Sequence, residues 1–134
     1  MSADGIYRRS WIAGIVVMHV VISIFHGAAH DGAHVPLSRA GTLFVFIVIL
    51  AGPIAGAAVM WRNTAIGSWI VAATLAASLV FGVVNHFILS SPDHVALVAR
   101  QWQPMFATTA VLLALTEALG AGLAIAVARE RTYA

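Results

Sequence analysis

The sequence predicts an all-α integral membrane protein: a four-helix bundle with both termini inside and a short interfacial helix between the third and fourth spans. Of its 134 residues, 61% are hydrophobic and only 9% are charged, whereas a typical soluble domain has about 25% charged residues. A transmembrane helix needs about 20 mostly apolar residues, and four such runs fill nearly the whole chain. We therefore expect residues 1–134 to form a single four-helix transmembrane domain.

Four apolar runs define the expected spans. They cover residues 11–29, 42–61, 65–89 and 105–128, and each is long enough to cross a hydrocarbon core about 30 Å thick. In the second run, Gly52 and Gly56 lie four residues apart, a spacing that permits close backbone packing. Pro53 removes one helical hydrogen bond from the same run.

The arginines indicate the orientation of these spans. One side of the expected bundle carries Arg8, Arg9, Arg62, Arg129 and Arg131, and the other carries Arg39 and Arg100. Because arginine is enriched in cytoplasmic loops, we expect a multi-pass protein of the bacterial inner membrane with both termini in the cytoplasm. The arginines are scattered at the ends of apolar runs, so the expected partner is the lipid bilayer and no nucleic acid is expected.

The loop after the third span has the features of a helix start. Ser91 is a suitable cap, Pro92 suits the first helical position, and Asp93 favours the positive end of the helix dipole. This pattern predicts a short helix that ends near Trp102 and lies in the interface before Pro104 redirects the chain.

Two ionisable residues are expected deep inside the bundle. His19 lies on a polar stripe of the first span together with Ser23, His26 and His30, because steps of four, seven and eleven residues return to nearly the same helix face. Glu117 is the acidic residue well inside an expected span, at a depth similar to that of His19. We predict that His19 and Glu117 form a polar pair, either a proton relay or ligand site, or a packing hydrogen bond worth about 1 kcal/mol.

The remaining histidines gather at the outer ends of the spans. A His-x-x-x-His step places two imidazoles on one helix face, which suits zinc, copper or iron. The predicted metal ligands are His26, His30, His34, His86 and His94. The residues predicted to orient them, by accepting their second N–H, are Asp31, Asp93 and Asn85. The alternative is that these histidines only bind water and loop carbonyls in the headgroup zone.

Haem b is a second cofactor that the histidines could hold. In that arrangement His26 and His86 are the axial ligands, Gly27 and Gly82 leave room for the macrocycle, and an arginine meets the propionates. The chain has no cysteine, so thiolate metal sites, iron–sulfur clusters and disulfides are excluded.

Two short strings of residues resemble a known group of proteins. They are His26-Gly27-Ala28-Ala29-His30 and His86-Phe87 followed by Ser90-Ser91-Pro92-Asp93-His94-Val95. Both are similar to strings in small bacterial four-helix integral membrane proteins of uncharacterised activity, and the resemblance covers most of the chain. It implies the same fold and carries no activity over.

The sequence therefore supports several functional hypotheses. The first is a membrane-embedded protein with a histidine-rich transition-metal site near the periplasmic face, with a redox role as one option, or a single haem b site. The second is a non-catalytic accessory subunit of a larger membrane complex. The third is a small proton-coupled transporter that uses His19 and Glu117 and works as a homo-oligomer. No catalytic residue is assigned.

Overall fold

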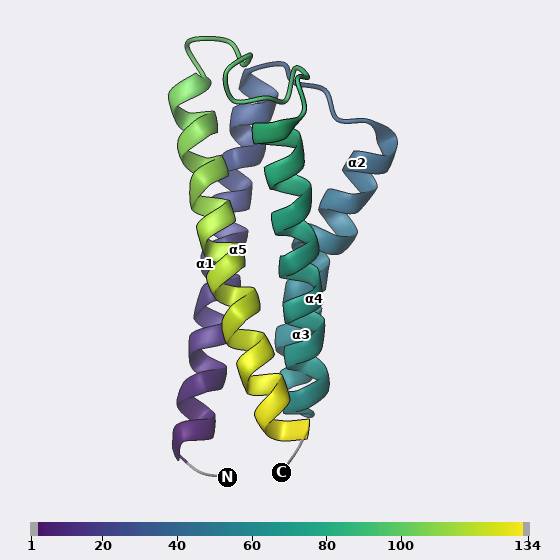
Figure 1. Ribbon diagram of the computed structural model, residues 1–134, viewed down its shortest axis with the longest axis vertical. Helices are drawn as coiled ribbons and strands as arrows, with labels where there is room; N and C mark the ends of the chain where they lie inside the picture. The colour runs from purple at the N-terminus through teal and green to yellow at the C-terminus, as the bar shows by residue number, and fades with distance from the viewer. Residues whose placement is uncertain (1–2, 133–134) are drawn as a thin grey trace.

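The computed structural model describes residues 3–132, and within this range the chain consists of helices joined by short connections. The elements in chain order are α1 (Ala3–Gly32), α2 (Arg39–Phe44), η1 (Val45–Ala51), α3 (Gly52–Met60), α4 (Thr64–Val83), η2 (Val84–Ile88) and α5 (Gln103–Thr132), where η marks a π-helical segment. Figure 1 shows four long helical rods side by side: α1, α2–η1–α3, α4–η2 and α5. We call the end that holds the start of α1 and the end of α5 the terminal end, and the opposite end the loop end.

Four helices of the described chain are long and apolar enough to cross a membrane. They are Tyr7–Gly32, Arg39–Met60, Thr64–Ile88 and Gln103–Glu130. Their outward faces expose large apolar side chains, such as Val17 at 64% and Leu119 at 69%. Such extensive apolar surface is unfavourable in water and suits lipid. The predicted all-helical fold with four apolar spans is confirmed, and α1 and α5 extend beyond the predicted ends.

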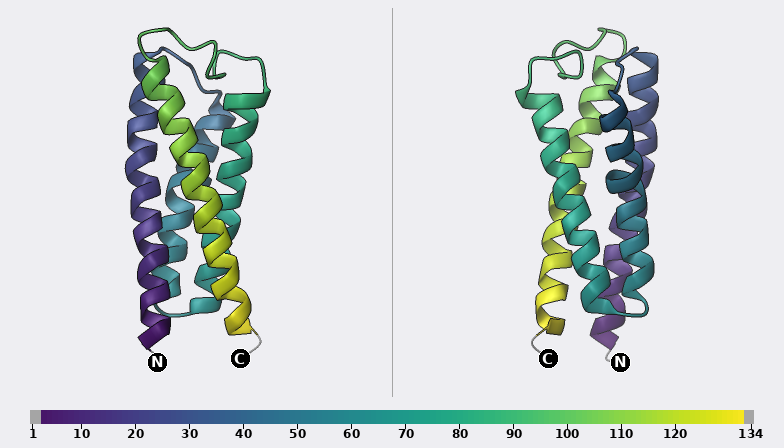
Figure 2. Two further views of the ribbon diagram at one scale, coloured as in Figure 1. Left: turned by 60° about the vertical axis from the view of Figure 1, so that its left-hand side comes forward. Right: turned by 90° about the vertical axis from the view of Figure 1, so that its right-hand side faces the viewer.

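The predicted interfacial helix between the third and fourth spans is wrong. Residues 91–102 form a series of turns and bends, and Figure 2 shows this segment crossing over the loop end of the bundle. The main-chain N–H of Val95 donates to the carbonyl of His86, 3.0 Å away, and so ties the loop back onto η2. The side chain of Asp93 also contacts His86. These tertiary contacts outweigh the local helix-start pattern of Ser91 and Pro92.

A proline in α3 links the second rod to α1. Pro53 has no N–H, so the carbonyl of Ile49, four residues earlier, has no α-helical donor. The chain widens here into the π-helical η1, and Nε2 of His19 donates to the Ile49 carbonyl oxygen at 2.9 Å. Because a carbonyl oxygen can only accept, Nε2 of His19 carries the proton and Nδ1 is left as an acceptor.

The bundle is packed most tightly at the terminal end. Its buried apolar residues are Ile12, Val16, Met60, Val71, Ala72, Leu75, Ala121, Ala124 and Val127. Glycines let α3 and α4 approach closely, as small residues do in membrane helix pairs. A Cβ atom added at Gly56 would lie only 2.8 Å from the main-chain nitrogen of Val71.

Gly67→Leu is expected to destabilise the protein by about 1–3 kcal/mol, the usual cost of overpacking a tight interior. An added Cβ at Gly67 would collide with main-chain atoms of Met60, so α3 and α4 would have to separate. Unfolding in mixtures of sodium dodecyl sulfate and mild detergent measures the effect. The control is Gly122→Leu, because a Cβ added there meets nothing within 4 Å; an equal loss of stability in both variants would contradict the prediction.

Candidate metal centre

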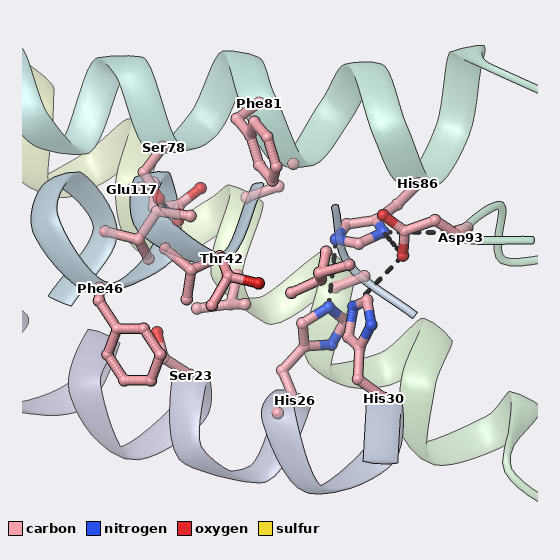
Figure 3. A pocket seen from close by; sticks show the side chains of 18 residues that line it. Ser23, His26, His30, Thr42, Phe46, Ser78, Phe81, His86, Asp93 and Glu117 are labelled. Carbon is pink, nitrogen blue, oxygen red and sulfur yellow. Dashed lines mark hydrogen bonds and ion pairs between the residues drawn. The ribbon is translucent and has the colours of Figure 1, made fainter. Parts of the chain in front are cut away.

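Three of the predicted histidines converge near the loop end. His26 and His30 lie one turn apart on α1, and His86 lies on η2. Each of these three side chains offers a ligand atom, and these atoms all lie within 4.8 Å of one another. Figure 3 shows the three imidazoles facing one another beside Asp93. His26 and His86 are buried and His30 is half-buried, so this cluster, His26–His30–His86, could hold a metal ion.

Local structure explains this convergence. The spacing of four residues returns His30 to the same face of α1 as His26. His86 lies in a π-helical segment, where the N–H of Leu89 bonds to the carbonyl of Val84 at 2.8 Å. Widened turns of this kind are rare and occur often at functional sites.

The protonation of His26 follows from its hydrogen bonds. The hydroxyl of Thr109 donates to the Met105 carbonyl oxygen at 2.7 Å, as helical threonines commonly do. Its oxygen is then an acceptor, and Nδ1 of His26 lies 2.8 Å from it. We therefore place the proton of His26 on Nδ1, which leaves a lone pair on Nε2.

His86 is fixed in the same way by the loop. Its Nδ1 donates to the main-chain carbonyl oxygen of Asp93 at 3.1 Å. This contact also leaves a lone pair on Nε2. Nε2 of His86 lies 3.1 Å from Nε2 of His26. Two buried lone pairs that face each other at this distance repel unless a cation, either a proton or a metal ion, lies with them.

Asp93 adds a negative charge to the cluster. Its Oδ1 lies 3.1 Å from Nδ1 of His86 and 3.2 Å from Nε2 of His30, yet this buried oxygen has no well-aligned hydrogen-bond donor. Burial acts to raise the pKa of Asp93, but the contacts with His86, His30 and His26 together hold its pKa below the ordinary value. The carboxylate is therefore ionised at neutral pH and favours a cation beside it.

Phe106 forms an apolar wall of the cluster. It is fully buried, and its ring centroid lies 4.8 Å from those of His26 and His30 and 5.3 Å from that of His86. Such a wall limits access of water and strengthens electrostatic interactions inside the site. Sequence reasoning missed Phe106 and the role of Thr109, because only the packing of α5 against α1 reveals them.

The spacing of the nitrogens fits a metal ion. In a tetrahedral site with metal–nitrogen bonds of about 2.0–2.1 Å, neighbouring nitrogens lie about 3.3–3.4 Å apart. The separation of 3.1 Å between the Nε2 atoms of His26 and His86 is close to this value. The ligand atom of His30 lies within 4.8 Å of the other two, so it would have to move closer to complete a three-nitrogen set.

The other predicted site residues lie outside this cluster. His34 has a positive φ of 54° after α1 and is exposed, as is Asp31. Nδ1 of His94 accepts the N–H of Ala96 at 3.1 Å, and the amide of Asn85 donates to the carbonyl of Phe81 at 2.8 Å. Helical spacing alone suggested His34, but α1 ends at Gly32 and the chain turns outward.

The geometry does not suit the predicted haem b. Two axial nitrogens on opposite faces of a haem iron lie about 4 Å apart, with the macrocycle between them. The Nε2 atoms of His26 and His86 are 3.1 Å apart, and the rings of His30 and Phe106 pack against His26 where a macrocycle would lie.

The second predicted pair meets deeper in the bundle. Nδ1 of His19 lies 3.6 Å from Oε1 of Glu117, and both side chains are buried. The hydroxyl of Ser78 donates to the same carboxyl oxygen and links α4 to α5. Nδ1 of His19 has no hydrogen-bond partner, so a single proton shared with Glu117 would complete the pair.

Ser78→Ala is expected to destabilise the protein by about 1 kcal/mol, the usual value of an interhelical hydrogen bond in a membrane. The variant removes the donor to Glu117 and leaves the His26–His30–His86 cluster untouched. Unfolding in detergent mixtures measures the loss. Thr116→Val is the control, because the Thr116 hydroxyl bonds only within its own helix, to the Leu112 carbonyl. An unchanged stability of Ser78→Ala would contradict this prediction.

A cavity of about 240 Å³ connects the two groups of polar residues. Toward the loop end it is lined by the histidine cluster and Asp93, and deeper in the bundle by Ser23, Ser78 and Glu117. Between these two groups the lining is mostly apolar and includes Val45, Ile49, Phe81, Ala110 and Leu113. Thr42 adds one hydroxyl group there (Figure 3). A metal ion in the cluster would therefore face a mostly apolar space.

The chain matches no protein-family model, no curated protein and no solved structure. The His26–His30–His86 cluster and the cavity beside it are therefore the features from which a function can be inferred.

Proposed function

We propose that this protein binds one transition-metal ion, zinc, copper or iron, through the Nε2 atoms of His26 and His86 and a ring nitrogen of His30. One observation carries the proposal: two buried Nε2 atoms lie 3.1 Å apart beside a buried carboxylate oxygen that has no aligned donor. Imidazole and carboxylate groups suit these three metals. A divalent ion would offset both the repulsion of the lone pairs and the charge of Asp93.

Asp93 and Thr109 would hold the imidazoles in place. Metal-binding histidines usually donate their second N–H to a carboxylate, a carbonyl or another acceptor, which fixes the tautomer. Here Nδ1 of His86 contacts the main-chain carbonyl oxygen and Oδ1 of Asp93, and Nδ1 of His26 contacts the hydroxyl oxygen of Thr109. Both contacts turn the Nε2 atoms toward the same point.

The cavity beside the cluster favours a site with an open coordination position. Structural zinc sites are closed by four protein ligands, whereas catalytic sites keep one position for water or substrate. Three histidines and a lined cavity match the second type. We therefore propose a reactive or transporting metal centre rather than a purely structural one.

The setting of this site in a cell is also a proposal. The arginine distribution favours a bacterial inner membrane with the terminal end in the cytoplasm. The His26–His30–His86 cluster would then lie near the periplasmic face. The resemblance to small bacterial four-helix membrane proteins supports the same setting. A homo-oligomer, or a place in a larger membrane complex, stays a prediction.

Metal titration tests the proposal directly. The protein is purified in mild detergent without a polyhistidine tag or chelator, and Zn²⁺ binding is measured by calorimetry and elemental analysis. We expect one ion per chain, lost in the double variant His26→Ala/His86→Ala. Absence of saturable binding, or equal binding in the double variant, would overturn the proposed function.

A further inference from the structure

We infer that the cavity between the histidine cluster and Glu117 binds a small molecule with an oxygen function at each end of an apolar body. This inference rests on the proposed metal site. The outer oxygen would ligate the metal at the open position, and the inner one, a hydroxyl, would bond to Glu117 and Ser23. The molecule would enter from the lipid.

The lining of the cavity sets the chemistry of its occupant. The middle is mostly apolar, with Thr42 as its polar residue, and cavities lined by apolar groups bind apolar molecules rather than water. The inner end offers acceptors, because the Ser23 hydroxyl donates to the carbonyl of His19 at 2.8 Å and so leaves its oxygen lone pairs available. A ligand hydroxyl is the matching donor there.

The fold also limits the length of the ligand. Ser78 and His86 are separated by eight residues along the α4–η2 rod, and Thr109 and Glu117 by eight residues along α5, which corresponds to about 12 Å along each axis. Helical side chains lean toward the N-terminus of their helix. Since these rods run in opposite directions (Figure 1), His86 and Glu117 lean toward each other, and the two ligand oxygens must lie less than about 12 Å apart.

The second rod provides the entry route. Phe46 lines the cavity and is also 61% exposed on the outer face of the bundle. It lies next to α2, which has no buried residue and leans away from the other rods in Figure 1. Figure 3 shows Phe46 and Phe81 on the wall of the cavity. An apolar molecule in the membrane would therefore enter the cavity beside Phe46.

The test uses Co²⁺ as a coloured substitute for the native metal. Co²⁺ is added to the protein in lipid nanodiscs, and its visible absorption is followed during titration with alkanoates of four to ten carbons and with their ω-hydroxy counterparts. We expect the ω-hydroxyalkanoate to bind about tenfold more tightly than the matched alkanoate at one optimal length, the effect of one additional hydrogen bond. The double variant Ser23→Ala/Glu117→Leu, which has no acceptor at either position, should remove that advantage and leave Co²⁺ binding unchanged.

A second pair of variants tests the location. Gly27 lines the cavity, and a Cβ added there meets nothing within 4 Å, so Gly27→Leu fills the cavity without a backbone clash. It should abolish binding of the longer ligands but retain Co²⁺. Gly122→Leu, equally free of clashes, should bind both normally.

The outcomes separate this inference from the proposed function. Co²⁺ binding with an optimal length, a hydroxyl advantage and the expected variant effects supports both. Co²⁺ binding with no optimal length and no hydroxyl advantage overturns the ligand inference and keeps the metal site. Failure of Co²⁺ to bind overturns both.

Discussion

His86→Ala is expected to weaken Zn²⁺ binding by more than about a hundredfold. Zinc sites with four ligands bind with about 10–16 kcal/mol, so each ligand contributes roughly 3 kcal/mol. His86 brings the single ligand from outside α1, since His26 and His30 lie on the same helix. Its loss leaves two imidazoles that cannot enclose the ion. Competition with a chelator of known affinity measures the change.

His34→Ala and His94→Ala are the matched controls. Both remove an imidazole near the loop end, but neither residue belongs to the His26–His30–His86 cluster. We expect their Zn²⁺ affinity to equal that of the parent protein. A large loss in either control, or none in His86→Ala, would mean that the ion is held elsewhere.

Asp93→Asn is expected to lower Zn²⁺ affinity by about 10–100-fold, the usual effect of losing a group that orients a ligand. The substitution keeps the shape of the side chain and the main-chain carbonyl that accepts the bond from His86. It removes the negative charge that lies 3.1–3.2 Å from His86 and His30. The same chelator competition measures the loss.

Asp31→Asn is the control for this charge effect. It makes the same chemical change at an exposed position near the end of α1. We expect its Zn²⁺ affinity to stay within about twofold of the parent, because exposed charges are screened by water and salt. Equal losses of Zn²⁺ affinity in the two variants would show that Asp93 acts only by adding negative charge to the loop end, and not through its contacts with His86 and His30.

The spans could be predicted from the sequence because lipid imposes a simple requirement. Every buried main-chain group must bond within its own segment, so long apolar runs become helices. The pairing of His26 with His30 also follows from helical spacing alone. His86 could be matched to them by its depth, since it lies at the end of the third run.

The loop could not be predicted in the same way. Ser91, Pro92 and Asp93 have the local pattern of a helix start, but Asp93 lies against His86 and His30 instead. This choice depends on residues distant in sequence, which local propensity does not contain. The proton positions of His26 and His86 likewise depend on Thr109 and on the path of the loop.

X-ray absorption spectroscopy of the Zn²⁺-loaded protein shows directly whether His26, His30 and His86 bind the ion. We predict scattering from three imidazole nitrogens at about 2.0–2.1 Å, reduced in His86→Ala and unchanged in His94→Ala. A spectrum without imidazole scattering, or one that His86→Ala leaves unaltered, would contradict a metal centre formed by His26, His30 and His86.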